Sequence, residues 1–296
     1  MDIRLVKFRL VLLLLILSLG NHSCKSQNVE TQFNKFAVAI LHTPVLNTSD
    51  FESVFGGESG DSLMLDEDGH ILTLEFIAIP NTVFEIHETI PKQGHSIYRI
   101  TTTDYPYTSA ELFIDSRFVN VLDKKPEERK VEMPAKEEII QNMEALEGYR
   151  YLWGGNYGDG VIEMLDFYNP SSDLDDDTKA SWCLKGVDCS GLIYQATNGT
   201  TPRNTSSLIY YGKGLEISRK SDTAIYQMLK PLDLIVWKGH VIIVLDEKTV
   251  IESRPPKGVQ KNDLLNRLKE VMEERQPVDD WDSSEGGRFV VRRWVE

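Results

Sequence analysis

The chain reads LDLIVWKGHVIIVL from Leu232 to Leu245. Two β-prone runs flank the turn residues Lys238-Gly239, a pattern that predicts two antiparallel strands. Thr249 to Glu252 predicts a third strand after a polar turn. In this meander His240 opens one strand and Glu252 ends the next. The two side chains are therefore expected to lie close together.

Cys189 stands in the stretch GVDCSGL, residues 186–192. Apolar residues follow it at helical spacing and Asn198-Gly199 supplies a stop, so a short helix is expected to begin at Asp188 or Cys189. Unpaired N–H groups at a helix start favour a thiolate, which predicts a lowered pKa for Cys189. The alternative is an inert, buried cysteine.

Only one histidine in the same half of the chain could act as the base for Cys189. Of the six histidines, His240 is the only one beyond residue 95. We expect Glu252 to accept the Nδ1 proton of His240 and so hold its tautomer, as the third residue of a hydrolytic triad does. The alternative for Glu252 is a solvated acid at a strand end. Cys189, His240 and Glu252 together predict hydrolysis of an amide bond by a thiol.

Five stretches carry a family resemblance. In order, they resemble the motifs of the NlpC-type cell-wall cysteine peptidases of the papain-like superfamily: YRYLWGG (149–155), DCSGL (188–192), TPR (201–203), PLDLIVW (231–237) and GHV (239–241). The resemblance covers residues 136–256. It implies an α+β fold with helices packed on an antiparallel sheet. It also implies cleavage of peptidoglycan stem peptides after γ-D-glutamate and before meso-diaminopimelate or lysine.

The resemblance also implies roles for single residues. Cys189 is the nucleophile, His240 the base, and Glu252 occupies a position where the family most often has histidine. Residues that hold the free amine and backbone of an L-Ala-γ-D-Glu end are Tyr151, Asp188 and Ser190. Arg203 either meets a substrate carboxylate or pairs with a nearby acid.

Two departures from the family pattern stand out. An insertion at about residues 157–186 separates the double glycine from Asp188, and it contains the acidic stretch Asp173 to Asp177. We expect the insertion to border the cleft and control access, with a surface excursion as the alternative. The acidic stretch lacks the glycine and the twelfth-position glutamate of an EF-hand loop, so no calcium site is predicted. Leu208 replaces a family glutamine, which is expected to alter the pocket nearby.

The N-terminus predicts an exported protein. Basic residues precede an apolar run, Leu10 to Leu19, that is too short to span a membrane, which indicates a signal peptide over residues 1–24. Cys24 is a candidate for the lipidated first residue of a bacterial lipoprotein in the periplasm or cell envelope. Simple secretion and a retained anchor are the alternatives. Cys183 is expected to be buried and inert, with a regulatory disulfide to Cys189 as the less favoured view.

Residues 27–123 predict a separate all-β unit. Short β-prone runs divided by turn residues favour a small barrel, and Glu111 to Val119 resembles the closing strand of bacterial SH3-like domains. The expected strands are 36–41, 71–79, 83–87, 97–102 and 111–119. A linker at 124–134 and the peptidase domain at 135–296 follow. That domain is expected to include helices near 139–146 and 264–272 and a last strand at 289–294.

The composition of the chain limits the classes of partner that the protein is expected to bind. The net charge is −14, so nucleic acid is an unsuitable partner. No Walker loop or zinc-ligand spacing occurs, and neither a cofactor nor a metal is expected. Membrane contact is expected only through Cys24, and the protein is expected to be a monomer. Two rival functions remain: another thiol amidase, acyltransferase or toxin on the same fold, for example an N-acetylmuramoyl-L-alanine amidase, and a non-catalytic wall-binding protein.

Overall fold

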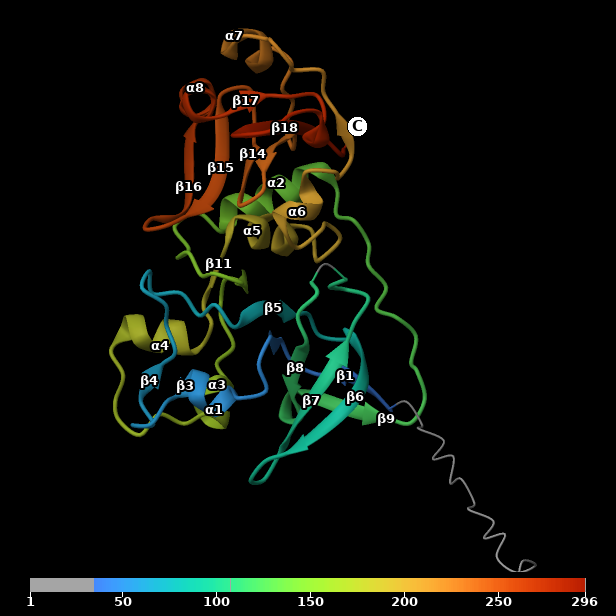
Figure 1. The fold of residues 1–296 in the computed structure, drawn as a ribbon, viewed down its shortest axis with the longest axis vertical. Coiled ribbons are helices and arrows are strands. Elements are labelled where there is room, and N and C mark those ends of the chain that lie inside the picture. Colours follow the sequence, from blue (N-terminus) through green and yellow to red (C-terminus); the bar gives the residue numbers. More distant parts are fainter. Residues whose placement is uncertain (1–34, 107, 296) are drawn as a thin grey trace, which may run out of the picture. The chain divides into compact units, whose positions relative to one another are not determined.

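Helices and antiparallel sheets are combined in this chain, which gives a mixed α/β fold (Figure 1). The computed structural model describes residues 35–106 and 108–295. The predicted signal peptide and Cys24 lie outside the described residues. Within the described ranges, no helix is both long enough and apolar enough to cross a membrane.

The predicted meander forms the centre of the C-terminal sheet. Trp237 pairs with His240 across the first turn, and Ile243 pairs with Ile251 across the second. The strand order is β12-β18-β13-β14-β15-β16, with β17 beside β18. The bounds are β12 (Lys213–Gly214), β13 (Leu234–Trp237), β14 (His240–Val244), β15 (Thr249–Arg254), β16 (Gly258–Asp263), β17 (Gln276–Pro277) and β18 (Arg288–Arg293). The predicted last strand is thus confirmed as β18.

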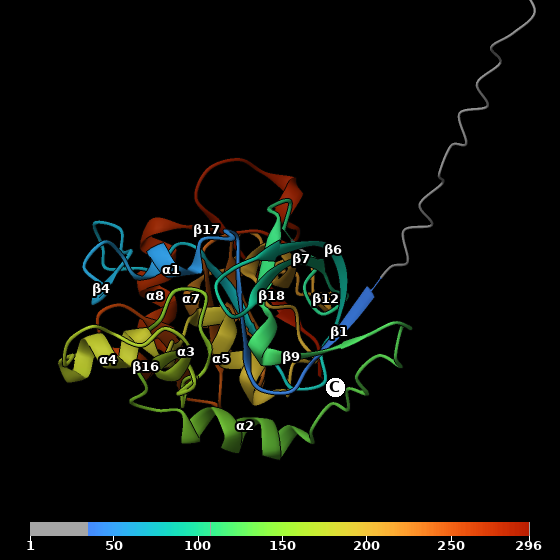
Figure 2. The ribbon, with the colours of Figure 1, turned by 90° about the horizontal axis from the view of Figure 1, so that it is seen from below.

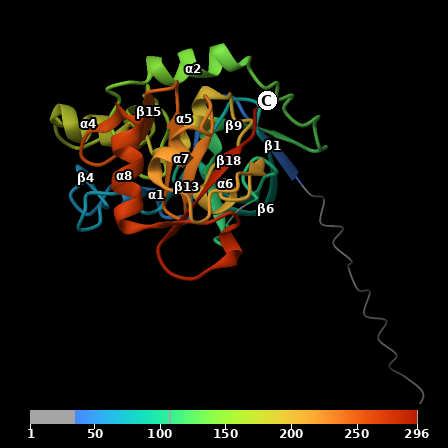
Figure 3. The ribbon, with the colours of Figure 1, turned by 90° about the horizontal axis from the view of Figure 1, so that it is seen from above.

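Helices cover this sheet. Helix α8 contacts β15 and β16, and Figure 3 shows it near β15. The helices are α2 (Lys136–Ala145), α5 (Cys189–Ala196), α6 (Thr205–Leu208), α7 (Asp222–Tyr226) and α8 (Leu264–Glu274). Leu192 and Ile193 of α5 share one hydrophobic core with Leu264 and Leu268 of α8 and with the central strands. Strands β13 and β14 are buried along almost their whole length, which explains their continuous apolar sequence.

The N-terminal residues form a second seven-stranded antiparallel sheet, in the order β5-β2-β8-β7-β6-β1-β9. The bounds are β1 (Lys35–Ala39), β2 (Thr43–Leu46), β5 (Leu74–Ala78), β6 (Val83–Pro91), β7 (Ser96–Thr101), β8 (Leu112–Asp115) and β9 (Val119–Leu122). The single strand expected at 111–119 is wrong, because the 3-10 helix η1 (Ser116–Phe118) divides it. The SH3-like character of this unit stays a prediction.

The insertion belongs to the core of the N-terminal sheet. It contains β10 (Asn156–Tyr157), α3 (Met164–Phe167), α4 (Asp176–Trp182) and β11 (Gly186–Val187). Met164, Trp182 and Leu184 are fully buried in one cluster with Phe51 and Phe55. These two phenylalanines lie at α1 (Phe51–Val54) and β3 (Phe55–Gly56), and β3 pairs with β4 (Ser62–Leu63). Figures 1 and 2 show α3 and α4 beside α1 and β4.

The expectation that the insertion borders the cleft is therefore wrong. Its apolar side chains are drawn into the N-terminal core, where burial stabilises them. The backbone N–H of Ser171 donates to Gly60 O at 2.8 Å, which ties the insertion to the β4 loop. The surface-excursion alternative fails as well, because the segment supplies large core residues. Residues on both sides of the predicted linker consequently fold as one compact unit.

Candidate active site

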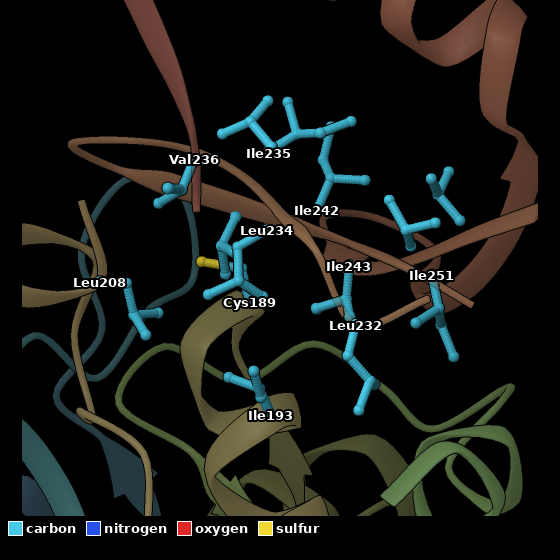
Figure 4. Close-up of a cluster of buried hydrophobic side chains, with 14 of the residues drawn as sticks. Cys189, Ile193, Leu208, Leu232, Leu234, Ile235, Val236, Ile242, Ile243 and Ile251 are labelled. Carbon is cyan, nitrogen blue, oxygen red and sulfur yellow. The ribbon is translucent and has the colours of Figure 1, made fainter. Parts of the chain in front are cut away.

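Cys189 is the first residue of α5, as the sequence predicts. Asp188 caps the helix: its Oδ1 accepts hydrogen bonds from the N–H groups of Ser190 at 3.0 Å and Gly191 at 2.7 Å. Figure 4 shows Cys189 with the buried side chains of α5, β13 and β14. The residue is only 7% exposed, so the sulfur lies at the edge of the hydrophobic core.

The electrostatics of the thiol differ from the expectation. Burial raises the pKa of Cys189 to about 12, and the Asp188 carboxylate acts in the same direction. N–H groups of Val241 and Ser190, together with Arg203, oppose the rise without cancelling it. The predicted lowering of the pKa is wrong because desolvation outweighs the helix start. In the resting protein the sulfur carries its proton, and a base must remove it.

His240 and Glu252 are in direct contact, but through a different ring nitrogen from the one expected. Nε2 of His240 lies 2.6 Å from Oε2 of Glu252, not Nδ1. Glu252 is fully buried, so it is not a solvated strand-end acid. With Nε2 engaged, Nδ1 is the nitrogen left to take the thiol proton. Within the described residues, no hydrogen bond joins the thiol to the imidazole; Sγ instead lies 3.9 Å from the carbonyl oxygen of Gly239.

Glu252 is the centre of a charged network that the sequence does not reveal. Oε1 accepts hydrogen bonds from Asn262 Nδ2 at 3.0 Å and Arg267 Nε at 2.7 Å, and Arg267 Nη2 donates to Oε2 at 3.1 Å. Burial opposes ionisation, but the hydrogen bonds from His240 and Arg267 outweigh it and lower the pKa of Glu252 to about 2. The carboxylate is thus charged whenever the protein is folded near neutral pH. The sequence contains one indication of this network, because Arg267 lies within the apolar stripe of α8, between Leu264 and Val271.

Five of the predicted site residues line one cavity of about 410 Å³. Its walls include Cys189 together with the four expected substrate-binding residues, Tyr151, Asp188, Ser190 and Arg203. No residue of 157–186 lines it. His240 faces a neighbouring pocket, and its ring lies 5.2 Å from that of Trp237. Cys189 and His240 thus line two different pockets.

Asp188 and Arg203 pair with each other inside this cavity wall. Arg203 Nη1 donates to Asp188 Oδ1 at 3.0 Å and Nη2 donates to Oδ2 at 2.8 Å. Arg203 is 2% exposed, and its Nη1 also donates to Ser190 Oγ at 2.7 Å. Of the two alternatives for Arg203, the structure shows the pairing with a nearby acid. The positive charge of Arg203 therefore balances the negative charge of Asp188. This pairing weakens the expected role of Asp188 as the partner of a substrate ammonium group.

The opposite wall comes from the N-terminal sheet, a contribution the sequence does not predict. Leu72, Leu74, Glu75 and Tyr105 line the same cavity as Cys189. Glu75 accepts hydrogen bonds from Tyr105 Oη at 3.1 Å and Asn47 Nδ2 at 2.9 Å. No lysine or arginine among residues 35–106 and 108–295 pairs with Glu75. The sequence contains one indication that Glu75 has a special role, because it is the only charged residue in the apolar strand β5.

Backbone contacts hold the two walls together. Asn156 donates through Nδ2 to Ile77 O at 2.8 Å, and its Oδ1 accepts from Ile77 N at 2.8 Å and from Arg203 Nε at 3.2 Å. A Cβ at Gly154 would lie 2.3 Å from Leu74 O, and Gly154 has φ +72°. The glycine pair of the YRYLWGG motif thus begins where only glycine permits contact with β5.

Three further sequence expectations concern residues outside the cavity. Leu208 is fully buried in the core around α5, so its replacement of glutamine does not reach the cavity wall. Cys183 is buried and both Cys183 and Cys189 are free thiols, so no disulfide joins them. Burial raises the pKa of Cys183, in agreement with an inert thiol.

One group of possible metal ligands occurs among the described residues. Atoms of Asp66, Asp68 and His70 lie within 4.8 Å of one another. Asp66 Oδ1 already accepts the backbone N–H groups of Asp68 and His70. The turn is held by its own hydrogen bonds, and the group supports no metal assignment.

Comparison with solved structures finds NlpC/P60 proteins. A NlpC/P60 family protein from Bacillus cereus ATCC 10987 is 15% identical, with a TM-score of 0.34 over 89% of this chain. This chain spans 64% of the length of that protein. The P60 domain of an antigen from M. avium paratuberculosis is 19% identical, with a TM-score of 0.28 over 43% of this chain and 82% of the domain. No protein-family model matches the sequence, and no curated protein sequence matches it.

Proposed function

We propose that this protein is a cysteine endopeptidase that cleaves peptidoglycan stem peptides between γ-D-glutamate and a diamino acid. The observation that carries the proposal is the arrangement of three side chains. Cys189 lines a cavity of about 410 Å³, and His240 begins strand β14 with its Nε2 2.6 Å from Oε2 of the buried Glu252 carboxylate. Such an arrangement serves nucleophilic attack on an amide carbonyl.

The reaction begins with transfer of the thiol proton. His240 Nδ1 takes the proton from Cys189, and Glu252 stabilises the imidazolium through Nε2–H. Because burial raises the pKa of the thiol to about 12, substrate binding and the paired base must together favour ion-pair formation. The thiolate then attacks the scissile carbonyl carbon. Asp188 engages the N–H groups of Ser190 and Gly191, so the N–H of Cys189 is the nearest helix donor for the oxyanion.

Collapse of the tetrahedral intermediate breaks the C–N bond. His240 returns its proton to the leaving nitrogen, which departs as an amine, and the acyl group stays on sulfur as a thioester. Water then attacks the thioester, with His240 accepting one proton of that water and delivering a proton to the departing sulfur. The products are a free carboxylate and a new amine. No cofactor or metal takes part in this sequence of steps.

The acyl half of the substrate occupies the cavity beside Cys189. An L-Ala-γ-D-Glu end carries a free ammonium group, which requires a carboxylate partner. Asp188 already pairs with Arg203, whereas Glu75 accepts hydrogen bonds from the neutral groups of Tyr105 and Asn47 and pairs with no cation among the described residues. We therefore assign the ammonium group to Glu75, with Tyr151 on the opposite wall. This assignment favours free muropeptides over stems whose alanine amine is acylated.

The decisive experiment is digestion of defined muropeptides by the purified protein. L-Ala-γ-D-Glu-meso-diaminopimelate should yield L-Ala-D-Glu and free diaminopimelate by mass spectrometry, and Cys189→Ala should yield neither. Release of intact stems from N-acetylmuramic acid would instead identify an N-acetylmuramoyl-L-alanine amidase. Transfer of an acyl group to an added amine without hydrolysis would identify an acyltransferase. Binding to sacculi with no new amine would identify a non-catalytic wall-binding protein, the alternative that the paired His240 and Glu252 disfavour.

A further inference from the structure

A second hollow lies against His240. This pocket of about 190 Å³ is lined by Trp237, His240, Arg254, Arg267, Glu270 and Arg275, among others. It shares no lining residue with the cavity around Cys189. Strands β13, β14 and β15 and the helix α8 form its walls. None of its charged residues belongs to the motifs that identify the nucleophile.

The chemistry of the reaction assigns this pocket to the leaving half of the substrate. His240 must lie within hydrogen-bond reach of the leaving nitrogen in order to protonate it. The acyl half occupies the side of Cys189, so the residue attached to the leaving nitrogen extends past His240. Its substituents then meet the pocket that His240 borders. Trp237, with its ring 5.2 Å from the His240 ring, supplies an apolar surface there.

The three arginines of this pocket differ in how well their charge is compensated. Arg267 pairs with Glu252 at 2.7 Å and with Glu270 at 3.0 Å. Arg275 pairs with Glu274 at 2.6 Å and lies 4.3 Å from the centre of the Trp237 ring. Both guanidinium groups are therefore engaged.

Arg254 is the exception. Its Nε lies 3.6 Å from Glu252 Oε1, an oxygen that already accepts hydrogen bonds from Asn262 and Arg267. Its side chain is 40% exposed, compared with 11% for Arg267. Arg254 thus has the least compensated positive charge in the pocket, and its guanidinium is accessible. A guanidinium in this position suits a carboxylate.

We propose that this pocket is a leaving-group subsite that binds a carboxylate of the diamino acid through Arg254. The inference rests on the proposed function and concerns its specificity. Two carboxylates are chemically suitable: the α-carboxylate next to the leaving nitrogen, present when the residue is the last of the peptide, and the side-chain carboxylate of diaminopimelate. Either would distinguish its substrate from one that ends in an uncharged amide.

The test uses three peptides with a constant acyl half, L-Ala-γ-D-Glu. The leaving residue is L-lysine, L-lysine carboxamide, or meso-diaminopimelate whose α-carboxyl group is a carboxamide. The first offers only an α-carboxylate, the third only a side-chain carboxylate, and the second offers neither. We expect kcat/KM for at least one acid to exceed that for lysine carboxamide by about tenfold, as one charge-assisted hydrogen bond provides. The favoured acid identifies the source of the carboxylate.

Two variants complete the experiment. Arg254→Gln should bring the acid-to-amide ratio close to one. Arg99→Gln, a change to a partly exposed arginine of β7 that pairs with Glu88, should leave the ratio as in the parent protein. Equal rates on all three peptides, or a ratio that Arg254→Gln does not change, would overturn the subsite while the proposed function stands. Cleavage of none of the three would overturn the proposed function and the subsite with it.

Discussion

The two hydrophobic cores of this protein are assembled in different ways. The core of the C-terminal sheet is drawn from residues 139–146 and 187–291, all of which follow the predicted linker. The core of the N-terminal sheet combines residues 37–119 with residues 152–184, which lie beyond the predicted linker. The first core carries Cys189, His240 and Glu252. The second carries the opposite cavity wall, so the site depends on both although its chemistry belongs to one.

The largest effect is expected when the thiol of Cys189 or the imidazole of His240 is removed, since both belong to the C-terminal half of the protein. Cys189→Ala and His240→Ala should each lower kcat/KM by about a thousandfold or more, because no other described group can replace the thiol or the base. The measurement is release of new amine from L-Ala-γ-D-Glu-meso-diaminopimelate. Both variants should remain folded, which their unfolding transitions check. Activity within tenfold of the parent for either variant would contradict the assignment.

Trp182→Ala tests whether the insertion is part of the N-terminal core. Trp182 is fully buried and its Nε1 donates to Tyr168 O at 2.9 Å, so the cavity left behind should lower the free energy of unfolding by about 3–5 kcal/mol. Chemical denaturation measures this change. Ile162→Ala is the matched control, because Ile162 lies in the same segment and is 62% exposed. Equal stability of the two variants would mean that the insertion does not support the core.

The thiol of Cys189 can be titrated through its rate of alkylation by iodoacetamide, read at this residue by mass spectrometry. With a pKa of about 12, the thiolate fraction at pH 7 is far below that of an exposed cysteine. Alkylation without substrate should therefore be on the order of a hundredfold slower than for free cysteine and should increase with pH up to the limit of folding. An alkylation rate that is already maximal near pH 7 would instead support the pKa lowering that the sequence predicts for Cys189 at the start of a helix.

Glu252 variants test how strongly the buried carboxylate orients His240. Glu252→Gln keeps an oxygen that can accept the Nε2 proton, so kcat should fall by about tenfold, whereas Glu252→Ala should cost about a hundredfold. Arg267 loses its partner in both variants, so unfolding must be measured beside activity. Equal activity for the two variants at equal stability would mean that the hydrogen bond to His240 has no orienting effect.

The smallest predicted effect concerns the wall from the N-terminal sheet. Glu75→Gln should lower kcat/KM by about tenfold for peptides with a free alanine amine, through loss of one ionic contact. The same peptide with an N-acetylated alanine serves as the comparison, because it has no ammonium group. Glu88→Gln is the control, since Glu88 lies on β6 and pairs with Arg99. An equal loss on both peptides would indicate a structural role for Glu75.

Local patterns predicted much of the C-terminal half. The meander, the start of α5 at Cys189, the helix α8 and the contact between His240 and Glu252 all depend on neighbouring strands or on a single turn. Short sequence separations make such features visible in hydrophobic periodicity and turn residues.

The rest of the site depends on distant contacts. Glu75 reaches the cavity because β5 lies against Gly154, and Arg267 reaches Glu252 because α8 packs beside β15. The thiol pKa was predicted in the wrong direction because desolvation is set by the whole surrounding core. The insertion was misplaced because its spacing in the sequence gives the positions of its ends, not the surface onto which its tryptophan packs.

The side-chain amide of Asn156 makes the pair of hydrogen bonds that a neighbouring strand would make with Ile77: it donates to Ile77 O and accepts from Ile77 N. The same amide oxygen also accepts a hydrogen bond from Arg203. Through Arg203 it is joined to Asp188, the residue before Cys189. The register of β5 is therefore coupled to the position of Cys189. A slip of one residue would turn Glu75 to the other face of the sheet. Recombination that exchanged the N-terminal domain alone would sever this coupling, so in evolution the two halves are expected to be inherited as one piece.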